Sequence, residues 1–170
     1  MLEEKLKEGR RVYMKLISIV IPTLNEAKGV SETLESIPIK DMRRLGYNVE
    51  IIVVDGGSSD GTVEIAKRKG AKVIHEPRKG YGRAYLTGFK EARGYIIATG
   101  DGDGTYPFNI IIKMLKFMEK YNFDFVTTNR FDRFERGAWH PVYFFGNRVL
   151  SFLVRVLFGL RVRDSQSGMW

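Results

Sequence analysis

The sequence of 170 residues contains no cysteine, which excludes disulfide bonds, thiolate zinc sites and cysteine nucleophiles. It has only two histidines, His75 and His140, which are too few for a histidine-rich metal site. No charge-free apolar run approaches the roughly 18 residues of a membrane-spanning helix. Residues 1–14 are charged and lack the apolar centre of a signal peptide. These absences favour a cytoplasmic protein.

The composition is that of one globular domain, with 44% hydrophobic and 28% charged residues. Lysine and arginine number 28 against 20 aspartates and glutamates, which gives a net charge of +8. This excess predicts an anionic partner. Composition leaves three kinds open: a nucleic acid, a nucleotide or phosphate, and an acidic membrane surface.

Short apolar runs alternate with amphipathic stretches as far as residue 128, and they predict strands and helices respectively. Strands are expected at 16–21, 49–54, 71–75, 95–99 and 123–128, and helices at 27–36, 62–69, 81–92 and from Pro107 to Met118. Such alternation implies parallel strands joined by right-handed crossovers. The predicted fold is therefore α/β, a three-layer α/β/α domain with a mainly parallel central sheet.

Polar clusters at 22–26, 55–60, 76–83 and 101–105 each follow a predicted strand. Ligands of such sheets bind beyond the carboxyl ends of the strands, so the clusters predict a single site. The sharpest signal is Asp101-Gly102-Asp103, because two carboxylates one residue apart can both reach a hard cation. Mg²⁺ or Mn²⁺ suits such oxygen ligands and would bridge a diphosphate. The plain alternative is a turn with solvated acids.

The other clusters each offer one candidate beside a structural role. We expect Asp55 to face the ligand and Asp60 to cap the following helix. Asn25 is expected to cap the helix after it, which leaves Glu26 as the functional candidate of that cluster. Residues 78–83 (RKGYGR) resemble a phosphate cradle of glycines and cations, although a solvated basic loop is as good an interpretation.

Residues 141–160 are strongly apolar but carry Arg148 and Arg155, spaced to share one helical face. Such a helix either packs on the sheet or lies in a membrane interface with its apolar side down. The chain stops at Trp170 in a turn-like stretch, which suggests that a longer protein continues beyond it.

Taken together, these stretches resemble the inverting glycosyltransferases of family two, which have the GT-A fold, and most closely the branch of dolichyl-phosphate mannose and glucose synthases. The motifs that carry the resemblance span nearly the whole chain in the expected order. They are Ile21 to Glu26, Val54 to Thr62, Lys79 to Ala84, Asp101-Gly102-Asp103, Asn129-Arg130-Phe131, and Asp164 to Gly168.

The resemblance implies a GDP- or UDP-sugar donor and assigns roles to individual residues. Pro22, Leu24, Glu26 and Asp55 would surround the base and ribose, with Lys79 near the nucleotide. Asp101, Gly102 and Asp103 would meet the diphosphate, the two aspartates as ligands of Mg²⁺ or Mn²⁺. Arg130, counted with the two aspartates as catalytic, and Arg148 would hold the phosphate of a lipid acceptor.

Three departures from the family pattern stand out. Gly56 occupies a position where the family often has a second aspartate, and Thr105 one where the mannose synthases commonly have a metal-binding glutamine. Family members also continue into a C-terminal region of interfacial or membrane-spanning helices. Residues 1–135 would thus form the nucleotide-sugar-binding core, and 136–170 a membrane-proximal acceptor segment of the same domain, cut short at its C-terminal end.

The expected reaction is metal-dependent transfer of a hexose to dolichyl (polyprenyl) phosphate with inversion, at the cytoplasmic face of a membrane on which the protein is peripheral. One alternative is a family-two transferase acting on a saccharide hydroxyl, which needs a carboxylate base such as Asp164. Another is a nucleic-acid-binding module, prompted by the net charge together with 8 tyrosines and 11 phenylalanines. Acidic pairs at the strand ends disfavour it, so no nucleic-acid partner is expected.

Overall fold

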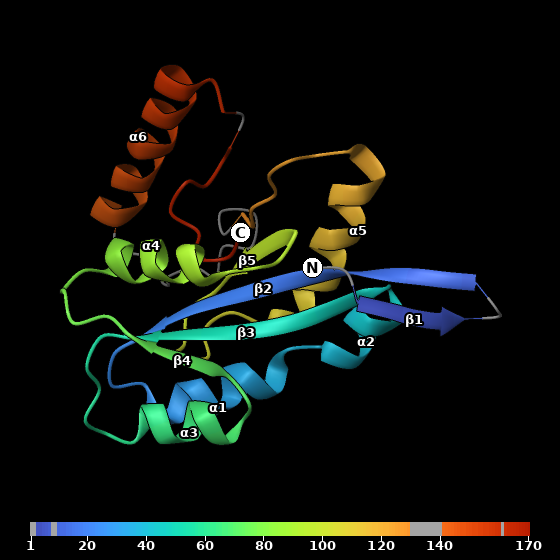
Figure 1. Ribbon diagram of the computed structural model, residues 1–170. Coiled ribbons are helices and arrows are strands. Elements are labelled where there is room, and N and C mark those ends of the chain that lie inside the picture. Colours follow the sequence, from blue (N-terminus) through green and yellow to red (C-terminus); the bar gives the residue numbers. More distant parts are fainter. Residues whose placement is uncertain (1–2, 8–9, 130–140, 161) are drawn as a thin grey trace.

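The computed structural model describes residues 3–7, 10–129, 141–160 and 162–170 (Figure 1). Strands and helices alternate after an initial hairpin. The elements are β1 (Glu3–Lys7), β2 (Arg10–Thr23), α1 (Ala27–Ser36), α2 (Ile39–Arg44), β3 (Tyr47–Asp55), α3 (Thr62–Arg68), β4 (Lys72–His75), α4 (Tyr81–Glu91), β5 (Ile96–Thr99), the 3₁₀ turn η1 (Phe108–Ile110), α5 (Ile111–Tyr121) and α6 (Pro141–Phe158).

The central sheet has the order β4-β3-β2-β5, and all four strands are parallel. Thr23 pairs with Asp55, and Asp55 with His75, so three strands end in one row. The chain moves outward from β2 through β3 to β4 and then returns to the other side of β2 as β5. This reversal creates a switch point between β2 and β5, where sheets of this kind bind ligands.

Helices cover both faces of the sheet. Ile17, Ile19 and Ile21 of β2 point into one core with residues from α1, α2, α3, η1 and α5, whereas Val20 points into a second core with α4. Figure 1 shows α4 on the opposite side of the sheet from α1 and α3. The alternating burial along β2 follows from the pleat of a strand, and it confirms the expected three-layer α/β/α arrangement.

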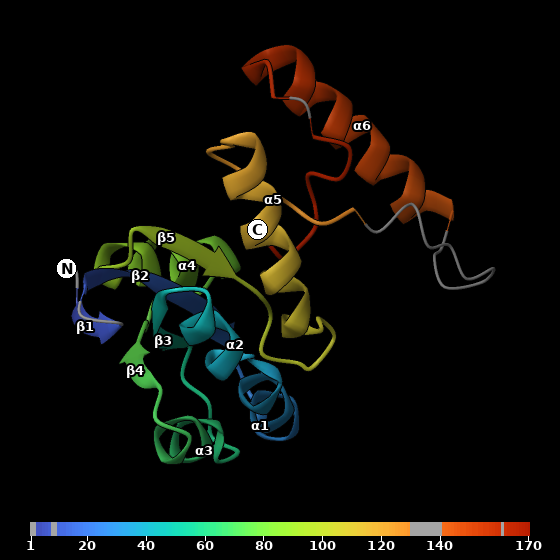
Figure 2. The same cartoon turned by 90° about the vertical axis from the view of Figure 1, so that its right-hand side faces the viewer.

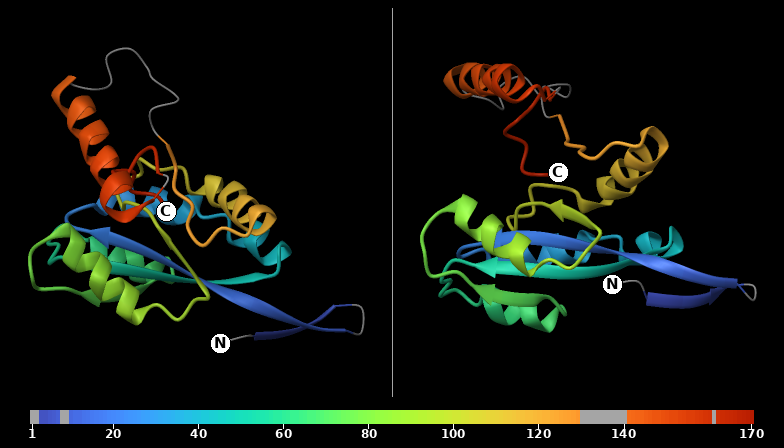
Figure 3. Two further views of the ribbon diagram at one scale, coloured as in Figure 1. Left: turned by 90° about the horizontal axis from the view of Figure 1, so that it is seen from above. Right: turned by 45° about the horizontal axis from the view of Figure 1, so that its top comes forward.

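Two parts of the sheet differ from expectation. The charged N-terminal stretch forms a hairpin, in which β1 pairs antiparallel with the start of β2 from Glu3 opposite Met14 to Lys7 opposite Arg10. Figure 3 shows this hairpin extending beyond the rest of the sheet. The strand expected at 123–128 does not form.

The C-terminal segment occupies the position that this strand would take. The amide of Thr99, at the end of β5, donates to the carbonyl of Trp170 at 2.6 Å, and the amide of Thr128 donates to the carbonyl of Met169 at 3.2 Å. Residues 169–170 therefore lie between β5 and the 123–128 segment and use hydrogen-bonding groups that a further strand would need.

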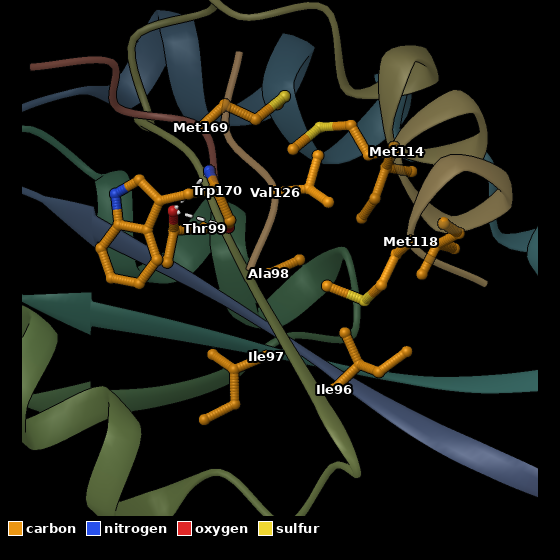
Figure 4. Close-up of a pocket in the computed structure, with 11 residues that line it drawn as sticks. Ile96, Ile97, Ala98, Thr99, Met114, Met118, Val126, Met169 and Trp170 are labelled. Atoms are coloured by element: carbon orange, nitrogen blue, oxygen red, sulfur yellow. Dashed lines mark hydrogen bonds between the residues drawn. The ribbon is translucent and has the colours of Figure 1, made fainter. Parts of the chain in front are cut away.

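A small apolar cavity of about 30 Å³ remains between β5, α5 and this segment, beside Met114, Val126 and Met169 (Figure 4). Sites for small molecules occupy roughly 300 Å³ or more, so this cavity is a packing gap.

Helix α6 confirms the helix expected at 141–160. Figure 1 and Figure 2 both show it away from the sheet. Most of its described apolar side chains are exposed, with Phe145, Leu157 and Phe158 each about 70% exposed. No helix in the described ranges has the length and apolar character needed to cross a membrane.

Candidate active site

A cleft of about 790 Å³ lies at the carboxyl ends of the strands, within the usual size of a small-molecule site. The loops after β2, β3, β4 and β5 all line it. Of the residues expected at the donor, all but Asp55 line the cleft: Pro22, Leu24, Glu26, Lys79, Asp101, Gly102 and Asp103. The structure thus brings together at the switch point residues that are far apart in the sequence.

Asp55 lies directly behind the cleft wall, and only 2% of it is exposed. Its carboxylate accepts hydrogen bonds from the amides of Gly57 and Ser58, both at 2.9 Å, and from the Ser58 hydroxyl. These bonds fix the turn after β3, and Gly56 and Gly57 of that turn line the cleft. Where the family often has a second aspartate, this chain therefore presents the backbone of Gly56.

The loops after β2 and β3 are joined by reciprocal hydrogen bonds. Asn25 adopts a left-handed conformation, with φ of 55°, and its side-chain oxygen accepts from the amide of Ser59 at 2.9 Å. The expectation that Asn25 caps α1 is wrong, because the first amide of α1, that of Ala27, donates to Asp60 instead. Asp60 also accepts from the amide of Thr62, the first residue of α3, although the N-cap residue of that helix is Gly61.

The basic loop after β4 presents its two cations differently. The guanidinium of Arg78 is paired with the carboxylate of Glu76 at 2.6 and 2.7 Å, and Glu76 is buried and also accepts from Thr87. These hydrogen bonds hold the pKa of Glu76 well below its usual range, the Arg78 side chain contributing most. Lys79 is exposed and lines the cleft. The charge of Arg78, an exposed residue, is thus balanced by the buried carboxylate of Glu76, and Lys79 offers a second cation at the cleft.

The Asp101-Gly102-Asp103 loop is held against the ends of β2 and α1. A Cβ atom on Gly102 would lie 2.6 Å from Cγ2 of Thr23, and one on Gly29 would lie 2.5 Å from the Cα of Asp103. Both glycines are therefore required by close approach of the chain. The hydroxyl oxygen of Thr33, on α1, accepts from the amide of Gly104 at 3.0 Å, which anchors the far end of the loop.

Two further contacts surround Asp101. The phenol of Tyr81, the first residue of α4, donates to Oδ1 of Asp101. Gly168 packs against the same carboxylate, since a Cβ there would lie 2.5 Å from Oδ2. Burial first, and then the hydrogen bond to Asp101, raises the pKa of Tyr81, and burial raises that of Tyr85 to about 12. Both phenols are therefore protonated at neutral pH.

The carboxylates present suit a cation that is shared with a bound diphosphate. Asp101 and Asp103 line the same cleft, and the described residues contain no group of three or more acidic or histidine side chains that could hold a metal alone. Mg²⁺ is commonly bound by one or two carboxylates, with phosphate oxygens and water completing the shell. Thr105, at the position of the commonly found glutamine, donates its amide to Asp103 at 2.8 Å.

The acceptor candidates lie on α6, in the C-terminal segment or outside the described residues. Arg130 lies outside the described residues, and Arg148 is exposed on α6. Asp164 is buried, and its carboxylate accepts from the amide of Gln166 at 3.1 Å. The amide of Ser165 donates to the hydroxyl of Ser151 at 3.0 Å, so the segment that reaches Asp101 through Gly168 also contacts α6.

The sequence does not single out two of the cleft residues, Glu76 and Tyr81, as site residues. Both lie within the polar cluster at 76–83. A carboxylate directly after a predicted strand was the available signal for Glu76. For Tyr81 the signal was its place between two glycines of the basic loop. Neither signal identifies the partner, because Arg78 and Asp101 are brought to them by the loop fold.

A parallel sheet that carries an acidic loop at its switch point, flanked by a basic loop, is the arrangement of the GT-A glycosyltransferases. The family model for glycosyl transferase family 2 matches residues 18–161, and the chain belongs to this family. The fold and the family assignment therefore agree.

The relatives agree with this assignment. The chain is 38% identical to Agl6, a low-salt glycan biosynthesis hexosyltransferase of Haloferax volcanii, over 90% of this chain and 37% of Agl6. It is 32% identical to a dolichyl-phosphate hexose transferase of the same organism, over 90% of this chain and 64% of the relative. The chain thus spans between about a third and two thirds of the length of these curated relatives.

Among solved structures, the chain resembles glucosyl-3-phosphoglycerate synthase from Mycobacterium tuberculosis in complex with Mn²⁺, UDP-glucose and phosphoglyceric acid. The two share a TM-score of 0.68 and 26% sequence identity, over 91% of this chain and 55% of that one.

Proposed function

We propose that this chain transfers a hexose from a GDP- or UDP-sugar to a polyprenyl (dolichyl) phosphate, with inversion and with a divalent cation. The donor part of this proposal is carried by one observation: Asp101, Asp103, Glu26 and Lys79 all line the same cleft. The complex of the solved relative with Mn²⁺ and UDP-glucose supports the same half.

The donor would lie across the switch point. Pro22, Leu24 and Glu26, with the turn that Asp55 fixes, would enclose the base and ribose. Asp101 and Asp103 would hold Mg²⁺ or Mn²⁺ against the diphosphate, with the backbone of Gly102 between them. The bound cation supplies a Lewis acid that stabilises the departing diphosphate. Lys79 would add a fixed positive charge where negative charge develops in the transition state.

The chemistry of the acceptor fits the residues available. An oxygen of the acceptor phosphate forms a bond to the anomeric carbon as the bond from that carbon to the diphosphate breaks, and the nucleoside diphosphate leaves. A phosphate monoester is already ionised near neutral pH, so this attack requires no general base. Arg130 and Arg148 would hold the acceptor phosphate, because guanidinium groups bind phosphate through paired hydrogen bonds.

The lipid acceptor is supported by α6 and by the name of one relative. The exposed apolar side chains of α6 suit the interfacial region of a bilayer, into which amphipathic helices place their apolar face. In this proposal residues 1–135 bind the nucleotide sugar, and 136–170 face the acceptor at the cytoplasmic surface of the membrane. The relative named a dolichyl-phosphate hexose transferase matches 90% of this chain, which supports the same kind of acceptor.

The test is to incubate the protein with Mn²⁺ and radiolabelled UDP- or GDP-hexoses, and to offer either polyprenyl phosphate in vesicles or a free oligosaccharide. Transfer to the lipid phosphate is expected. Transfer to the oligosaccharide alone would overturn the lipid acceptor and favour the hydroxyl-acceptor alternative with Asp164 as base, since a neutral hydroxyl must lose its proton.

A second arm tests the donor site by calorimetric titration of UDP or GDP with Mn²⁺. Asp103→Asn should abolish the metal-dependent part of nucleotide binding, because it removes one of the two carboxylates offered to the cation. Asp124→Asn, a matched change at an exposed position that does not line the cleft, should leave that part unchanged. If the Asp103 variant binds the nucleotide with Mn²⁺ as tightly as the wild type does, the proposed metal site is wrong.

A further inference from the structure

Tyr81 is the residue of the cleft whose contact bears most directly on the proposed cation site. It begins α4 and lines the cleft, and more than half of it is exposed. Its phenol nevertheless donates a hydrogen bond to Oδ1 of Asp101, which lies on the loop after β5. A tyrosine has an ordinary pKa of about 10, so at neutral pH this hydroxyl can act as the donor.

The ring of Tyr81 is held in place by its own helix. Tyr85, one turn further along α4, meets it edge to face, with the ring centroids 4.9 Å apart, and the two hydroxyls are 3.2 Å apart. Tyr85 is buried against Phe89 and Trp170, at centroid distances of 5.6 and 5.5 Å. Trp170 in turn donates its amide to the Thr99 hydroxyl at 3.1 Å. The phenol is therefore fixed by a packed aromatic stack.

The carboxylate of Asp101 is bounded on its other oxygen as well. The backbone of Gly168 lies so close to Oδ2 that a Cβ there would be only 2.5 Å away, and the amide of Gly168 donates to the hydroxyl of Tyr106 at 2.9 Å. The carboxylate plane is thus confined from two directions.

We propose that Tyr81 is a positioning residue, whose phenol fixes the side-chain rotation of Asp101 so that its carboxylate faces the cation and diphosphate. The inference rests on the proposed function, because it assigns Asp101 to that cation. Hydrogen-bond donors that orient a ligating carboxylate typically change metal affinity by about 10- to 100-fold when they are removed. Tyr81 would act on the nucleotide sugar only through Asp101.

The experiment replaces Tyr81 by phenylalanine, which keeps the ring and its contact with Tyr85 but removes the hydroxyl. Tyr95→Phe is the matched control, because Tyr95 is 75% exposed and does not line the cleft. Mn²⁺ is titrated into each protein in the presence of saturating UDP, and again with GDP, and binding is followed by calorimetry or by the electron paramagnetic resonance of free Mn²⁺. UDP and GDP are also titrated in EDTA.

We expect Tyr81→Phe to bind Mn²⁺ about 10- to 100-fold more weakly, with an unchanged nucleotide affinity in EDTA. Tyr95→Phe should match the wild type in both measurements. Urea unfolding of each variant checks that the fold is intact, and a midpoint equal to that of the wild type confirms that the effect is local.

Three results would overturn the inference. If the wild type binds Mn²⁺ and Tyr81→Phe binds it equally well or more tightly, the phenol does not orient the ligand, although the proposed function stands. If nucleotide affinity in EDTA falls as much as Mn²⁺ affinity, Tyr81 contacts the nucleotide directly. If the wild type shows no nucleotide-dependent Mn²⁺ binding, the proposed function fails together with the inference.

Discussion

Replacement of Gly29 by alanine should change the stability of the protein in two opposing ways, through the helix propensity of α1 and through the packing of α1 against the acidic loop. Gly29 lies in the first turn of α1, and a Cβ there would lie 2.5 Å from both the Cα and the carbonyl carbon of Asp103, and 2.7 Å from the carbonyl oxygen of Gly102. These are backbone atoms, so no side chain can rotate out of the way. The loop must move, or α1 must.

The two effects have opposite signs. Alanine is better than glycine in a helix by up to about 1 kcal/mol, which would stabilise the variant. Overpacking of a buried contact costs about 1–3 kcal/mol, and contacts this short with backbone atoms belong at the upper end of that range. The expected net result is a loss of about 1–2 kcal/mol in the free energy of unfolding.

Urea unfolding measures this loss, because the midpoint falls while the slope with denaturant is unchanged. The control is Gly82→Ala in α4, where a Cβ would meet nothing within 4 Å, so its stability should be unchanged or raised by up to about 1 kcal/mol. The Gly29 variant should also weaken Mn²⁺-dependent nucleotide binding by displacing Asp103. A Gly29→Ala protein as stable as the wild type would refute the close contact between α1 and this loop.

Two further predictions concern the basic loop and α6. The pKa of Glu76 is depressed in the folded protein, so its contribution to stability is present above the ordinary glutamate pKa of about 4.3 and is lost as the pH falls below it. The stability difference between wild type and Glu76→Gln should therefore shrink below about pH 4 in pH-dependent urea unfolding; a difference that is constant with pH would contradict the ion pair. Phe152→Asp with Phe158→Asp should lower binding to anionic vesicles by at least about tenfold, because burial of one phenylalanine is worth about 1.5–3 kcal/mol. Binding is measured by co-sedimentation with the vesicles, and the control is Leu45→Asp, a change at an exposed position at the end of α2. An equal loss of vesicle binding in the control and in the α6 variant would contradict a membrane-facing α6.

The sequence was sufficient to predict the sheet and the edge at which the site lies. Buried runs such as 16–21 carry their own signal, and parallel strands must end at a common edge, so the row Thr23, Asp55 and His75 follows from alternation alone. The N-terminal hairpin carries no such signal, since four of the residues 3–7 are charged and strand predictions depend on buried apolar alternation.

The errors arise where a local pattern competes with a distant partner. Residues 123–128 have the composition of a strand, but residues 169–170 take the hydrogen bonds beside β5, and only the folded chain brings them there. Asn25 has the composition of a helix cap, yet its amide oxygen accepts from Ser59 in another loop. In both places a contact more than 30 residues away along the sequence outweighs the local preference.

The same dependence on distant partners holds the acidic loop of the candidate site in place. The acidic loop is held by Gly29 and Thr33 from α1, by Tyr81 from α4 and by Gly168 from the C-terminal segment. Electrostatic stabilisation of a transition state is effective when the charged groups need no rearrangement as the reaction proceeds. Each of these supports comes from a different element, so a change at any one should displace a carboxylate by a small distance without unfolding the sheet. Metal-dependent nucleotide binding should therefore respond to such changes more strongly than global stability does.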